Sequence, residues 1–388
     1  NEWLEWQQTL HPKNIDFKLE RIKSVYKKLN IKKIANKVII VAGTNGKGST
    51  VAILESILYE NNFSVGTFTS PHIRNYNERI RINKKEVCTD SLLDTFKMIN
   101  KLRGDTTLTY FEFGTLAAFN LLSNFNCDAL LIEVGLGGRL DATNIIDPLI
   151  SVITNISYDH TDILGNTLEE IANEKAGIFK KNSKIIIGER NKIVDEVFIK
   201  KAKEVSSLIT FVPDLNDQEN YSTVNYLNTN IKTAVHTCRA LNLNNVDNDS
   251  ILSGISNINK NSQLIGRWTT VSNNPKIIFD AAHNLAGFKC ISSQLDKTKY
   301  NQLHIILAFI KGKNISELIS TLPLNSNIYY TSINMERGMT QSEIIQNVGR
   351  SIIFDKNPKR LLDIVKGRCS DQDIILITGS NFIAKSIL

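Results

Sequence analysis

Apolar residues recur at helical spacing near the start of the chain and then give way to a short β-branched run. Residues 19–29 carry apolar side chains three or four positions apart, which predicts an amphipathic helix. Residues 38–41 are a compact apolar strand candidate, and residues 49–61 return to helical spacing after a glycine-rich turn. The pattern predicts a helix followed by a strand–loop–helix unit.

Strand and helix patterns continue to alternate through the first two thirds of the chain. The strand candidates are residues 64–69, 129–134, 149–155 and 184–188, and helical patterns such as 113–123 and 168–178 separate them. This alternation predicts a doubly wound α/β sheet. The Asn- and Ser-rich residues 242–262 have the composition of a loop region.

A second series of elements begins after the polar stretch at residues 272–275. Its strand candidates are residues 276–279, 303–309, 327–330, 351–354 and 374–378, and its helix candidates are 287–295, 315–322, 341–348 and 359–365. We therefore predict two domains: residues 1–270 as a P-loop, doubly wound domain and residues 275–388 as a smaller Rossmann-like α/β domain.

Composition narrows the class of protein. The 388 residues are 42% apolar and 22% charged, which suits two globular domains. The net charge of +7 is spread along the chain without basic runs, so anionic small molecules are better partners than nucleic acid. No apolar stretch approaches the roughly 20 residues of a membrane span, and the start lacks an export signal. Five scattered cysteines indicate reduced thiols and a cytoplasmic location.

The turn at residues 43–49 has the sequence Gly-Thr-Asn-Gly-Lys-Gly-Ser between the predicted strand and helix. Backbone amides at a helix N-terminus cradle phosphate, and Lys47 adds a positive charge near the β- and γ-phosphates. The general phosphate-loop pattern would need glycine in place of Val41, and Gly48 is an extra residue between Lys47 and Ser49. A tight turn without a ligand is the alternative interpretation.

Four further motifs follow the loop in a fixed order. They are Thr-Ser-Pro-His at 69–72, Glu-Val-Gly-Leu-Gly-Gly-Arg-Leu-Asp-Ala-Thr-Asn at 133–144, Asp-His-Thr at 159–161 and Glu-Lys-Ala-Gly-Ile-Phe at 174–179. With the loop, they closely resemble the bifunctional dihydrofolate synthase/folylpolyglutamate synthase family of the Mur ligase superfamily. The resemblance runs from the Leu10-His11 segment to Gly379-Ser380, and it implies an ATP-dependent ligase that joins a carboxylate to an amine.

A carboxylate at the carboxyl end of a strand is well placed to hold a metal ion, and Glu133 ends such a strand. The resemblance makes Glu133 a Mg²⁺ ligand together with Ser70, His160 and a carbamylated Lys175. It implies two Mg²⁺ ions, with a monovalent cation such as K⁺ as a further candidate. From the residues alone, His160 could equally be a satisfied polar side chain and Lys175 a solvated lysine.

The resemblance also implies which residues contact ATP: Thr44, Asn45, Gly46, Lys47, Gly48, Ser49, Asn230, Arg267 and Asp280. Lys47, Lys175, His160 and Arg267 are the expected catalytic residues. Arg267 has a physical rationale of its own, since a guanidinium can hold phosphate oxygens in pairs. The family commonly has proline where this chain has Leu285, and residues 379–382 also depart from its pattern, so the glutamate contacts stay unassigned. His283 is either a ligand-orienting or a core histidine.

Two segments resemble the pterin-side loops of the family, and a third near the N-terminus matches another such segment. The expected substrate contacts are Ile15, Asp16, Phe17, Thr109, Tyr110, Phe111, Glu112, Leu140, Asp141 and Ala142. Aromatic faces can stack on a pterin ring, whereas the alternative is that Tyr110 and Phe111 are core residues at the start of a helix.

The implied reaction uses ATP to phosphorylate dihydropteroate, or the γ-carboxylate of tetrahydrofolate or its polyglutamates. The amine of L-glutamate then attacks the acyl phosphate. The enzyme is expected to act as a monomer. Three alternatives stay open: a Mur-type ligase for peptidoglycan precursors, a nucleotide-gated regulatory ATPase, and a binding protein that has lost its catalytic activity.

Overall fold

Two compact units make up the chain. The computed structural model describes residues 2–13, 15–215, 221–243, 246–262, 264–349 and 352–387. The N-terminal unit comprises residues 1–223 and 227–263, and the C-terminal unit comprises residues 224–226 and 264–388. The two units divide before Leu264, a few residues earlier than the boundary that the sequence predicts between residues 270 and 275.

The described part of the N-terminal unit is built on an eight-stranded sheet of order β4-β3-β2-β5-β1-β6-β7-β8. Its strands are β1 (Lys37–Ala42), β2 (Val65–Phe68), β3 (Ile80–Ile82), β4 (Lys85–Glu86), β5 (Ala129–Glu133), β6 (Ile150–Ile153), β7 (Lys184–Ile187) and β8 (Leu208–Phe211). The six strands from β2 to β8 in the sheet are parallel, and β3 and β4 add an antiparallel edge. The predicted doubly wound sheet is confirmed.

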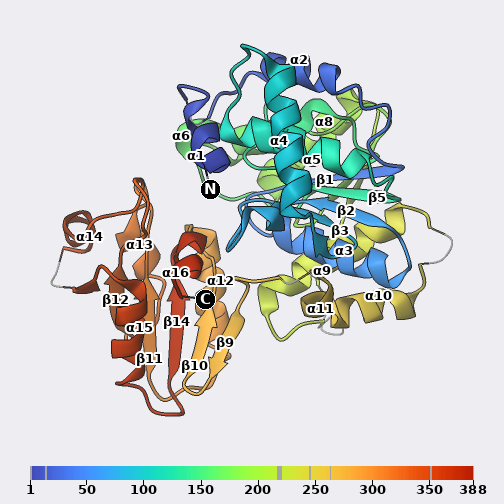
Figure 1. Cartoon of the computed structure of the whole chain (residues 1–388). Helices are drawn as coiled ribbons and strands as arrows, with labels where there is room; N and C mark the ends of the chain where they lie inside the picture. Colours follow the sequence, from blue (N-terminus) through green and yellow to red (C-terminus); the bar gives the residue numbers. More distant parts are fainter. Residues whose placement is uncertain are drawn as a thin grey trace. The chain divides into compact units, whose positions relative to one another are not determined.

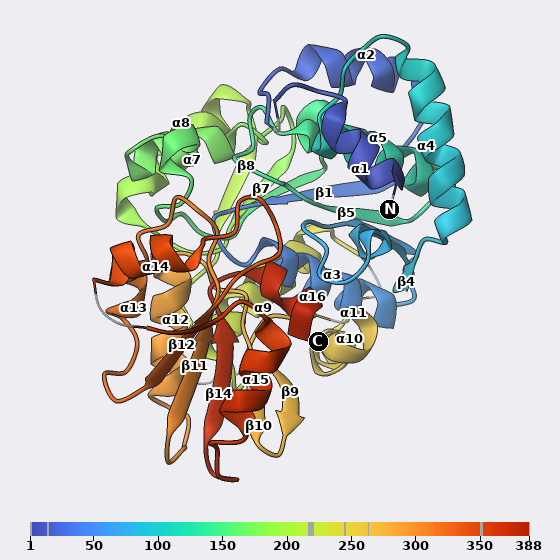
Figure 2. The same ribbon diagram turned by 60° about the vertical axis from the view of Figure 1, so that its left-hand side comes forward.

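Helices cover both faces of this sheet (Figures 1 and 2). One face carries α2 (Leu19–Leu29), α4 (Thr89–Arg103), α5 (Tyr110–Ser123) and α8 (Lys192–Glu204), and the other carries α3 (Lys47–Glu60), α9 (Asn225–Ala240), α10 (Asn248–Ser256) and α11 (Ile258–Ser262). The remaining helices of the unit are α1 (Glu2–Thr9), α6 (Thr161–Leu164) and α7 (Leu168–Ala176), with short 3₁₀ turns at Tyr76–Arg79 and Ala142–Ile145.

Strand β1 shows why the sheet is buried on both faces. Side chains alternate across a strand, so Val38, Ile40 and Ala42 join one apolar core while Ile39 and Val41 join the other. A continuous apolar run is what a central parallel strand requires.

The carboxyl ends of β1, β5 and β6 meet at one edge of the sheet. Val41 pairs with Glu133, and Ala42 pairs with Ile153. The connection after β1 runs to β2 on one side of β1, whereas the connection after β5 crosses to β6 on the other side. This edge is therefore a topological switch point, where α/β proteins form ligand sites. The phosphate-loop candidate, the Glu133 carboxylate and the residues after β6 are therefore gathered at this edge.

The C-terminal unit has its own six-stranded sheet in the described residues, of order β13-β12-β11-β14-β10-β9. The strands are β9 (Thr269–Asn273), β10 (Lys276–Phe279), β11 (Leu303–Leu307), β12 (Asn327–Thr331), β13 (Ile353–Asp355) and β14 (Ile374–Thr378). The helices are α12 (Leu285–Leu295), α13 (Ile315–Ile319), α14 (Gln341–Val348), α15 (Pro358–Lys366) and α16 (Ala384–Ile387), with a 3₁₀ turn at Asn381–Ile383. All strand pairs except β9–β10 are parallel, which confirms the Rossmann-like prediction.

The prediction of a loop at residues 242–262 was wrong. Helices α10 and α11 occupy most of this segment; residues 244 and 245 lie outside the described part. Asp247 caps α10 by accepting the Ser250 N–H at 2.8 Å, and Ile251 and Ile255 lie one turn apart on its buried face. Apolar spacing outweighed a loop-like composition.

Strand β9 also changes the interpretation of the polar stretch at residues 272–275. It pairs antiparallel with β10, so the stretch is the end of a strand and a hairpin turn. Ser351, the first residue of a predicted strand, lies outside the described residues, and β13 begins at Ile353. Among the described residues we find no helix with the length and apolar character needed to cross a membrane.

The contact between α10 and α3 provides a test of the packing. A Cβ added to Gly254 would lie 2.5 Å from Ile57 Cα, so Gly254→Ala must push the helices apart. We expect thermal or urea unfolding to show a loss of about 1–3 kcal/mol, as for other overpacked cores. Ser256→Ala, at an exposed position of the same helix, should change stability by less than about 0.5 kcal/mol. Equal stabilities for both variants would contradict the close packing.

Candidate active site

The glycine-rich loop forms a tight turn between β1 and α3. Gly46 caps α3 with φ of 81°, and a Cβ there would lie 2.2 Å from Asn230 Oδ1, so only glycine fits. The Lys47 ammonium donates to the carbonyls of Gly43 at 3.1 Å and Thr44 at 3.2 Å. Ser49 is fully buried. Helix α3 thus begins at the loop, and its amino end offers N–H groups to an anion.

The residues that follow β6 hold the loop in this shape. The Asn155 carbonyl accepts the Thr44 N–H at 3.0 Å, and its side-chain oxygen accepts the Asn45 N–H at 2.9 Å. The Thr154 hydroxyl donates to the Asn45 carbonyl at 2.6 Å. The Thr44 hydroxyl donates to the Ser157 carbonyl at 3.1 Å and accepts the Ser157 N–H at 3.0 Å. The loop is therefore preorganised by a neighbouring strand end.

Lys175 is buried beside the loop. It lies in the last turn of α7, is 4% exposed, and its ammonium donates to the Gly43 carbonyl at 3.0 Å. The same carbonyl accepts from Lys47, so two cationic side chains converge on one oxygen. Burial lowers the pKa of Lys175 to about 7, and the charge of Lys47 acts in the same direction against Asp159 and Asp141. The sequence alternative of a solvated lysine is wrong.

Close packing between two motifs fixes the position of Lys175. A Cβ on Gly138 would lie 2.7 Å from the Lys175 carbonyl and 2.8 Å from the Glu174 carbonyl. The Arg139 N–H donates to the Glu174 carbonyl at 2.7 Å, and its guanidinium pairs with the Glu174 carboxylate at 2.8 Å. From the sequence, Arg139 could orient substrate or cap a loop and stays unassigned; in the structure it holds the end of α7 against the glycine-rich turn.

The expected metal ligands lie at the same strand edge, with different degrees of burial. Glu133 is 6% exposed, and its carboxylate accepts the Ser70 N–H at 2.9 Å. A Cβ on Gly48 would lie 3.4 Å from both Glu133 carboxylate oxygens, which places this carboxylate at the loop. His160 is exposed at the start of α6 with φ of 50°, and Asp159 Oδ1 accepts its N–H at 3.0 Å.

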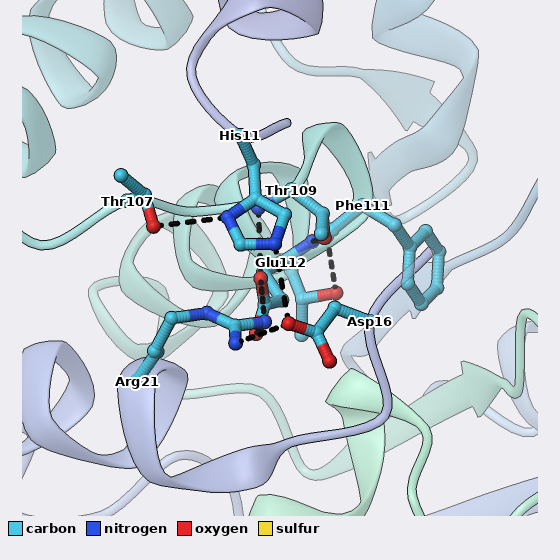
Figure 3. A network of polar contacts seen from close by, with 8 residues as sticks. His11, Asp16, Arg21, Thr107, Thr109, Phe111 and Glu112 are labelled. Atoms are coloured by element: carbon cyan, nitrogen blue, oxygen red, sulfur yellow. Dashed lines mark hydrogen bonds and ion pairs between the residues drawn. The ribbon is translucent and has the colours of Figure 1, made fainter. Parts of the chain in front are cut away.

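A second polar cluster joins the N-terminal segment to the start of α5 (Figure 3). Arg21 donates to Asp16 at 2.7 Å and to both oxygens of Glu112 at 3.1 and 3.2 Å. His11 contacts Asp16 at 3.2 Å and Thr107 at 2.9 Å. This charge network pins the segment around Asp16 to α5. Nearby, Ile15 is exposed and Phe17 is half-buried.

Thr109 and Glu112 also have a structural task. The Thr109 hydroxyl accepts the Glu112 N–H at 3.2 Å and the Glu112 carboxylate accepts the Thr109 N–H at 2.7 Å, which is a capping box for α5. Of the two aromatic residues between them, Tyr110 packs edge-on to Tyr76 and Phe111 stacks on Phe68 with centroids 6.0 Å apart. Both rings are half-buried, so each retains surface for a ligand.

Asp141 shapes the turn that follows β5. Its carboxylate accepts the Leu136 N–H at 2.9 Å, the Thr143 N–H at 2.9 Å and the Thr143 hydroxyl at 2.6 Å. Burial raises the pKa of Asp141 while these hydrogen bonds oppose the rise. Leu140 is half-buried and Ala142 is buried beside it. The residues expected to contact substrate thus also form the turn.

In the C-terminal unit, Asp280 lies just past the carboxyl end of β10 and is 4% exposed. Its carboxylate accepts the Trp268 N–H at 2.8 Å, the Ala282 N–H at 3.0 Å and the Tyr226 hydroxyl. Burial raises the pKa of Asp280, and the charge of Arg267 opposes that rise. Arg267 and Asp280 are therefore close in space. Asn284 caps α12 at 2.9 Å from the Gly287 N–H, so the helix begins normally at Leu285.

Comparison with known proteins gives the family. Residues 41–262 match the Mur ligase middle domain, and residues 266–381 match the Mur ligase glutamate ligase domain. The dihydrofolate synthase/folylpolyglutamate synthase of Escherichia coli strain K12 is 34% identical over 97% of this chain and 92% of its own length. The chain belongs to the dihydrofolate synthase/folylpolyglutamate synthase family. Its members are Mur-type ligases, and this chain is accordingly an ATP-dependent ligase.

Solved structures of this family have the same fold. Escherichia coli FolC in complex with DHPP and ADP has a TM-score of 0.90 at 32% identity, over 99% of this chain and 95% of that one. A bifunctional folylpolyglutamate synthase/dihydrofolate synthase with Mn, AMPPNP and L-glutamate bound has a TM-score of 0.87 at 30% identity, over 99% and 96%. The Bacillus subtilis relative is 29% identical over 89% of this chain and 88% of its own length.

Several residues that hold this family site together were not predicted. Thr154 and Asn155 support the loop, Arg21 bridges two carboxylates, and Tyr226 contacts Asp280. Thr154 and Asn155 are the last two residues of the strand predicted at 149–155, and polar residues at the end of an apolar strand could have drawn attention. Arg21 lies within an amphipathic helix pattern, which carries no sign that its guanidinium is shielded from solvent.

The lowered pKa of Lys175 can be measured directly. In metal-free protein without CO₂, we expect one lysine ¹³Cε NMR resonance to titrate near pH 7, because burial disfavours the ammonium form. Below that pH the amine is protonated, and above it the amine is neutral. Lys175→Gln should remove this resonance alone. Lys97→Gln, which changes a lysine whose side chain is 65% exposed, is the control and should leave this resonance in place. A spectrum with every lysine above pH 9 would contradict the assignment.

Proposed function

We propose that this protein adds L-glutamate to dihydropteroate and to the γ-carboxylate of tetrahydrofolate and its polyglutamates, with ATP as co-substrate. The observation that supports this most is the convergence of Lys47 and buried Lys175 on the Gly43 carbonyl, beside Glu133. A regulatory ATPase would need the loop alone. The ligands of the solved relatives, DHPP and ADP in one and Mn, AMPPNP and L-glutamate in another, support the same reaction.

The proposed reaction has two steps. A carboxylate oxygen of the acceptor attacks the γ-phosphorus of ATP, ADP leaves, and an acyl phosphate forms. The neutral amine of glutamate then attacks the acyl carbon, phosphate leaves with the bonding electrons, and the nitrogen loses a proton to solvent. The chemistry requires alignment and charge neutralisation, with no nucleophilic side chain.

We assign the neutralisation of phosphate charge to the glycine-rich loop and to two cationic side chains, Lys47 and Arg267. The loop amides from Thr44 to Ser49 and the Lys47 ammonium would hold the β- and γ-phosphates, as at other helix N-termini. Arg267 would neutralise charge on the transferred phosphoryl group, with Asp280 setting its position through their electrostatic attraction. Asn230, packed against Gly46, would complete the nucleotide contacts.

Divalent metal ions fit the oxygen-rich strand edge. Glu133 supplies a buried carboxylate at the loop, and Ser70 is fixed to it by a 2.9 Å hydrogen bond. Magnesium prefers such hard oxygen ligands and keeps part of its water shell. We propose that Glu133, Ser70, His160 and Lys175 hold two Mg²⁺ ions, with K⁺ as an additional cation. A bound divalent ion would neutralise phosphate charge during transfer.

Carbamylation of Lys175 resolves an electrostatic conflict at this edge. A protonated Lys175 would place a buried cation next to the half-buried Lys47 and any metal ion. A neutral amine can instead attack CO₂, lose a proton and become a carbamate, which carries a negative charge. The depressed pKa makes the neutral amine available near pH 7. We therefore propose that Lys175 acts as a carbamate.

The acceptor would bind on the side of the Arg21 network. We assign to it Ile15, Asp16 and Phe17, the α5 start from Thr109 to Glu112, and the turn from Leu140 to Ala142. The half-buried rings of Tyr110 and Phe111 offer faces for a pterin. We also propose a monomeric, cytoplasmic enzyme, which the five free cysteines suit.

The activity can be decided by product analysis. Purified protein with ATP, Mg²⁺ and glutamate should convert dihydropteroate and tetrahydrofolate into glutamylated products, identified by mass. Lys47→Ala should lower kcat by roughly 10²-fold or more, because a phosphate-neutralising cation is lost. Lys97→Ala, an exposed lysine, is the matched control and should keep wild-type rates. ATP hydrolysis without product from either acceptor would favour the regulatory ATPase, and product from a peptidoglycan precursor alone would favour the Mur-type alternative.

The carbamate has its own spectroscopic test. With ¹³C-bicarbonate, wild-type protein should show a carbamate carbon resonance above neutral pH that disappears as pH falls below about 7, because the amine becomes protonated. Lys175→Gln should lack the signal, and Lys97→Gln should keep it. An active enzyme without this resonance under assay conditions would refute the proposed modification.

A further inference from the structure

Three potential metal ligands cluster in the C-terminal unit, in a region with no role in the proposed reaction. One ring nitrogen of His304, the Cys369 thiol sulfur and one Asp373 carboxylate oxygen all lie within 4.8 Å of one another. His304 is the second residue of β11, Asp373 directly precedes β14, and Cys369 lies between α15 and β14. Residues distant in the sequence are thus brought together at the amino ends of two paired strands.

The imidazole of His304 has an unsatisfied polar atom. The residue is 4% exposed, and its Nε2 atom is buried without a hydrogen-bond partner. Its other nitrogen, Nδ1, lies 3.2 Å from the Tyr329 hydroxyl, and the two rings stack with centroids 5.9 Å apart. When Nδ1–H donates to this hydroxyl, Nε2 keeps a free lone pair. A buried imidazole with an unused nitrogen is costly unless something binds it.

Asp373 is fixed in place by the backbone. Its two carboxylate oxygens accept the Gln302 N–H at 3.0 Å and the Ser370 N–H at 2.7 Å. These hydrogen bonds favour the ionised form, and the pKa of Asp373 is lowered. The residue is 6% exposed, yet each oxygen has a second lone pair. The cluster therefore contains a preoriented anion.

Cys369 completes the set from a half-buried position. Its thiol donates to the Val365 carbonyl at 3.2 Å, which anchors the sulfur at the end of α15. Burial and the charge of Asp373 raise the pKa of this thiol. A free nucleophile would need the opposite shift, so the thiol is poorly suited to covalent catalysis. A bound dication would stabilise its thiolate form.

We propose that His304, Cys369 and Asp373 form a binding site for a divalent transition metal of the zinc class. Nitrogen, sulfur and carboxylate oxygen are the ligands that Zn²⁺ takes, at about 2.0–2.3 Å, with a water molecule in the fourth position. Ligand atoms around tetrahedral zinc are separated by about 3.4 Å, so side-chain shifts of about 1 Å would close the cluster. The thiol proton is released to solvent when the metal binds.

The charges around the cluster suit a dication. Thiolate and carboxylate ligands together balance the two positive charges. Burial lowers the pKa of His304; the charge of Asp373 opposes this, and Arg368, whose guanidinium lies 5.9 Å from the Tyr329 ring centroid, acts in the same direction as burial. The neutral imidazole that results is the form that binds metal.

The position of the cluster indicates a structural task. Asp280, the proposed nucleotide contact, follows the carboxyl end of β10, whereas His304 and Asp373 lie at the amino ends of the parallel strands β11 and β14. Mg²⁺ prefers all-oxygen ligands, so the two metal sites differ in chemistry as well as in place. A metal at the amino ends would connect β11 to the α15–β14 segment.

Cobalt binding tests the site in the full-length protein. After removal of metals by a chelator, Co²⁺ is titrated in excess Mg²⁺, which occupies oxygen sites. We expect one equivalent to bind with a sulfur-to-cobalt charge-transfer absorption, and Zn²⁺ to displace it and raise the Tm. Cys369→Ser should abolish this absorption and weaken binding at least tenfold, and His304→Gln should weaken it as well.

Cys88→Ser is the matched control, because Cys88 is an exposed thiol of the N-terminal unit. It should retain wild-type binding and absorption, and every variant is checked for native circular dichroism. The proposal is overturned if wild-type protein shows no thiolate absorption, or if the absorption survives in folded Cys369→Ser or disappears in Cys88→Ser. If Cys369→Ser does not fold, the wild-type and Cys88→Ser spectra still decide.

Discussion

Two lysine ammonium groups share the carbonyl of Gly43, and most of the candidate active site is arranged around this contact. Lys47 reaches the oxygen from α3 at 3.1 Å, and Lys175 reaches it from α7 at 3.0 Å. Burial disfavours a charged ammonium and the two like charges repel each other, so the more deeply buried Lys175 loses its proton more easily. The lowered pKa of Lys175 therefore depends on its burial and on the loop that places Lys47 beside it.

Close packing with a neighbouring motif holds Lys175 in this position. The glycine-rich turn after β5 approaches the backbone of Glu174 and Lys175 so closely that Gly138 has no room for a side chain. The Asp141 carboxylate holds the turn after β5 in shape by accepting three hydrogen bonds. The residues expected to contact a ligand therefore also maintain the shape of the turn on which they lie. A substitution there changes shape and chemistry together.

The C-terminal unit separates two kinds of chemistry by the direction of its strands. Parallel strands gather their carboxyl ends at one edge, where Asp280 and Arg267 attract each other. Their amino ends gather at the opposite edge, where His304 and Asp373 lie on paired strands. Hard oxygen ligands in the N-terminal unit and a mixed nitrogen–sulfur–oxygen set here favour different cations. In our proposals, the chain would therefore use Mg²⁺ for phosphate chemistry and a different metal to stabilise local structure.

Sequence by itself determined the elements whose causes are local. Continuous apolar runs predicted the central strands, helical spacing predicted α2, α5 and α15, and the loop predicted a strand–turn–helix unit, because each pattern depends on neighbours only a few residues away. The five motifs together indicated the family. The helices at Asn248–Ser256 and Ile258–Ser262 were not predicted, because their composition is polar overall. Both helices pack against α3.

Only the tertiary structure decided which distant residues come into contact and how the pKa of each is shifted. Burial of Lys175 depends on the distant Gly43 and Gly138, the Arg21 network joins segments about 90 positions apart, and the His304 cluster joins strand β11 to residues that precede β14. The pKa of a side chain depends on its burial and on charges that are near it in space, whereas sequence patterns reflect only distance along the chain. The family could therefore be identified from the sequence, whereas the electrostatics of the candidate site depend on the tertiary structure.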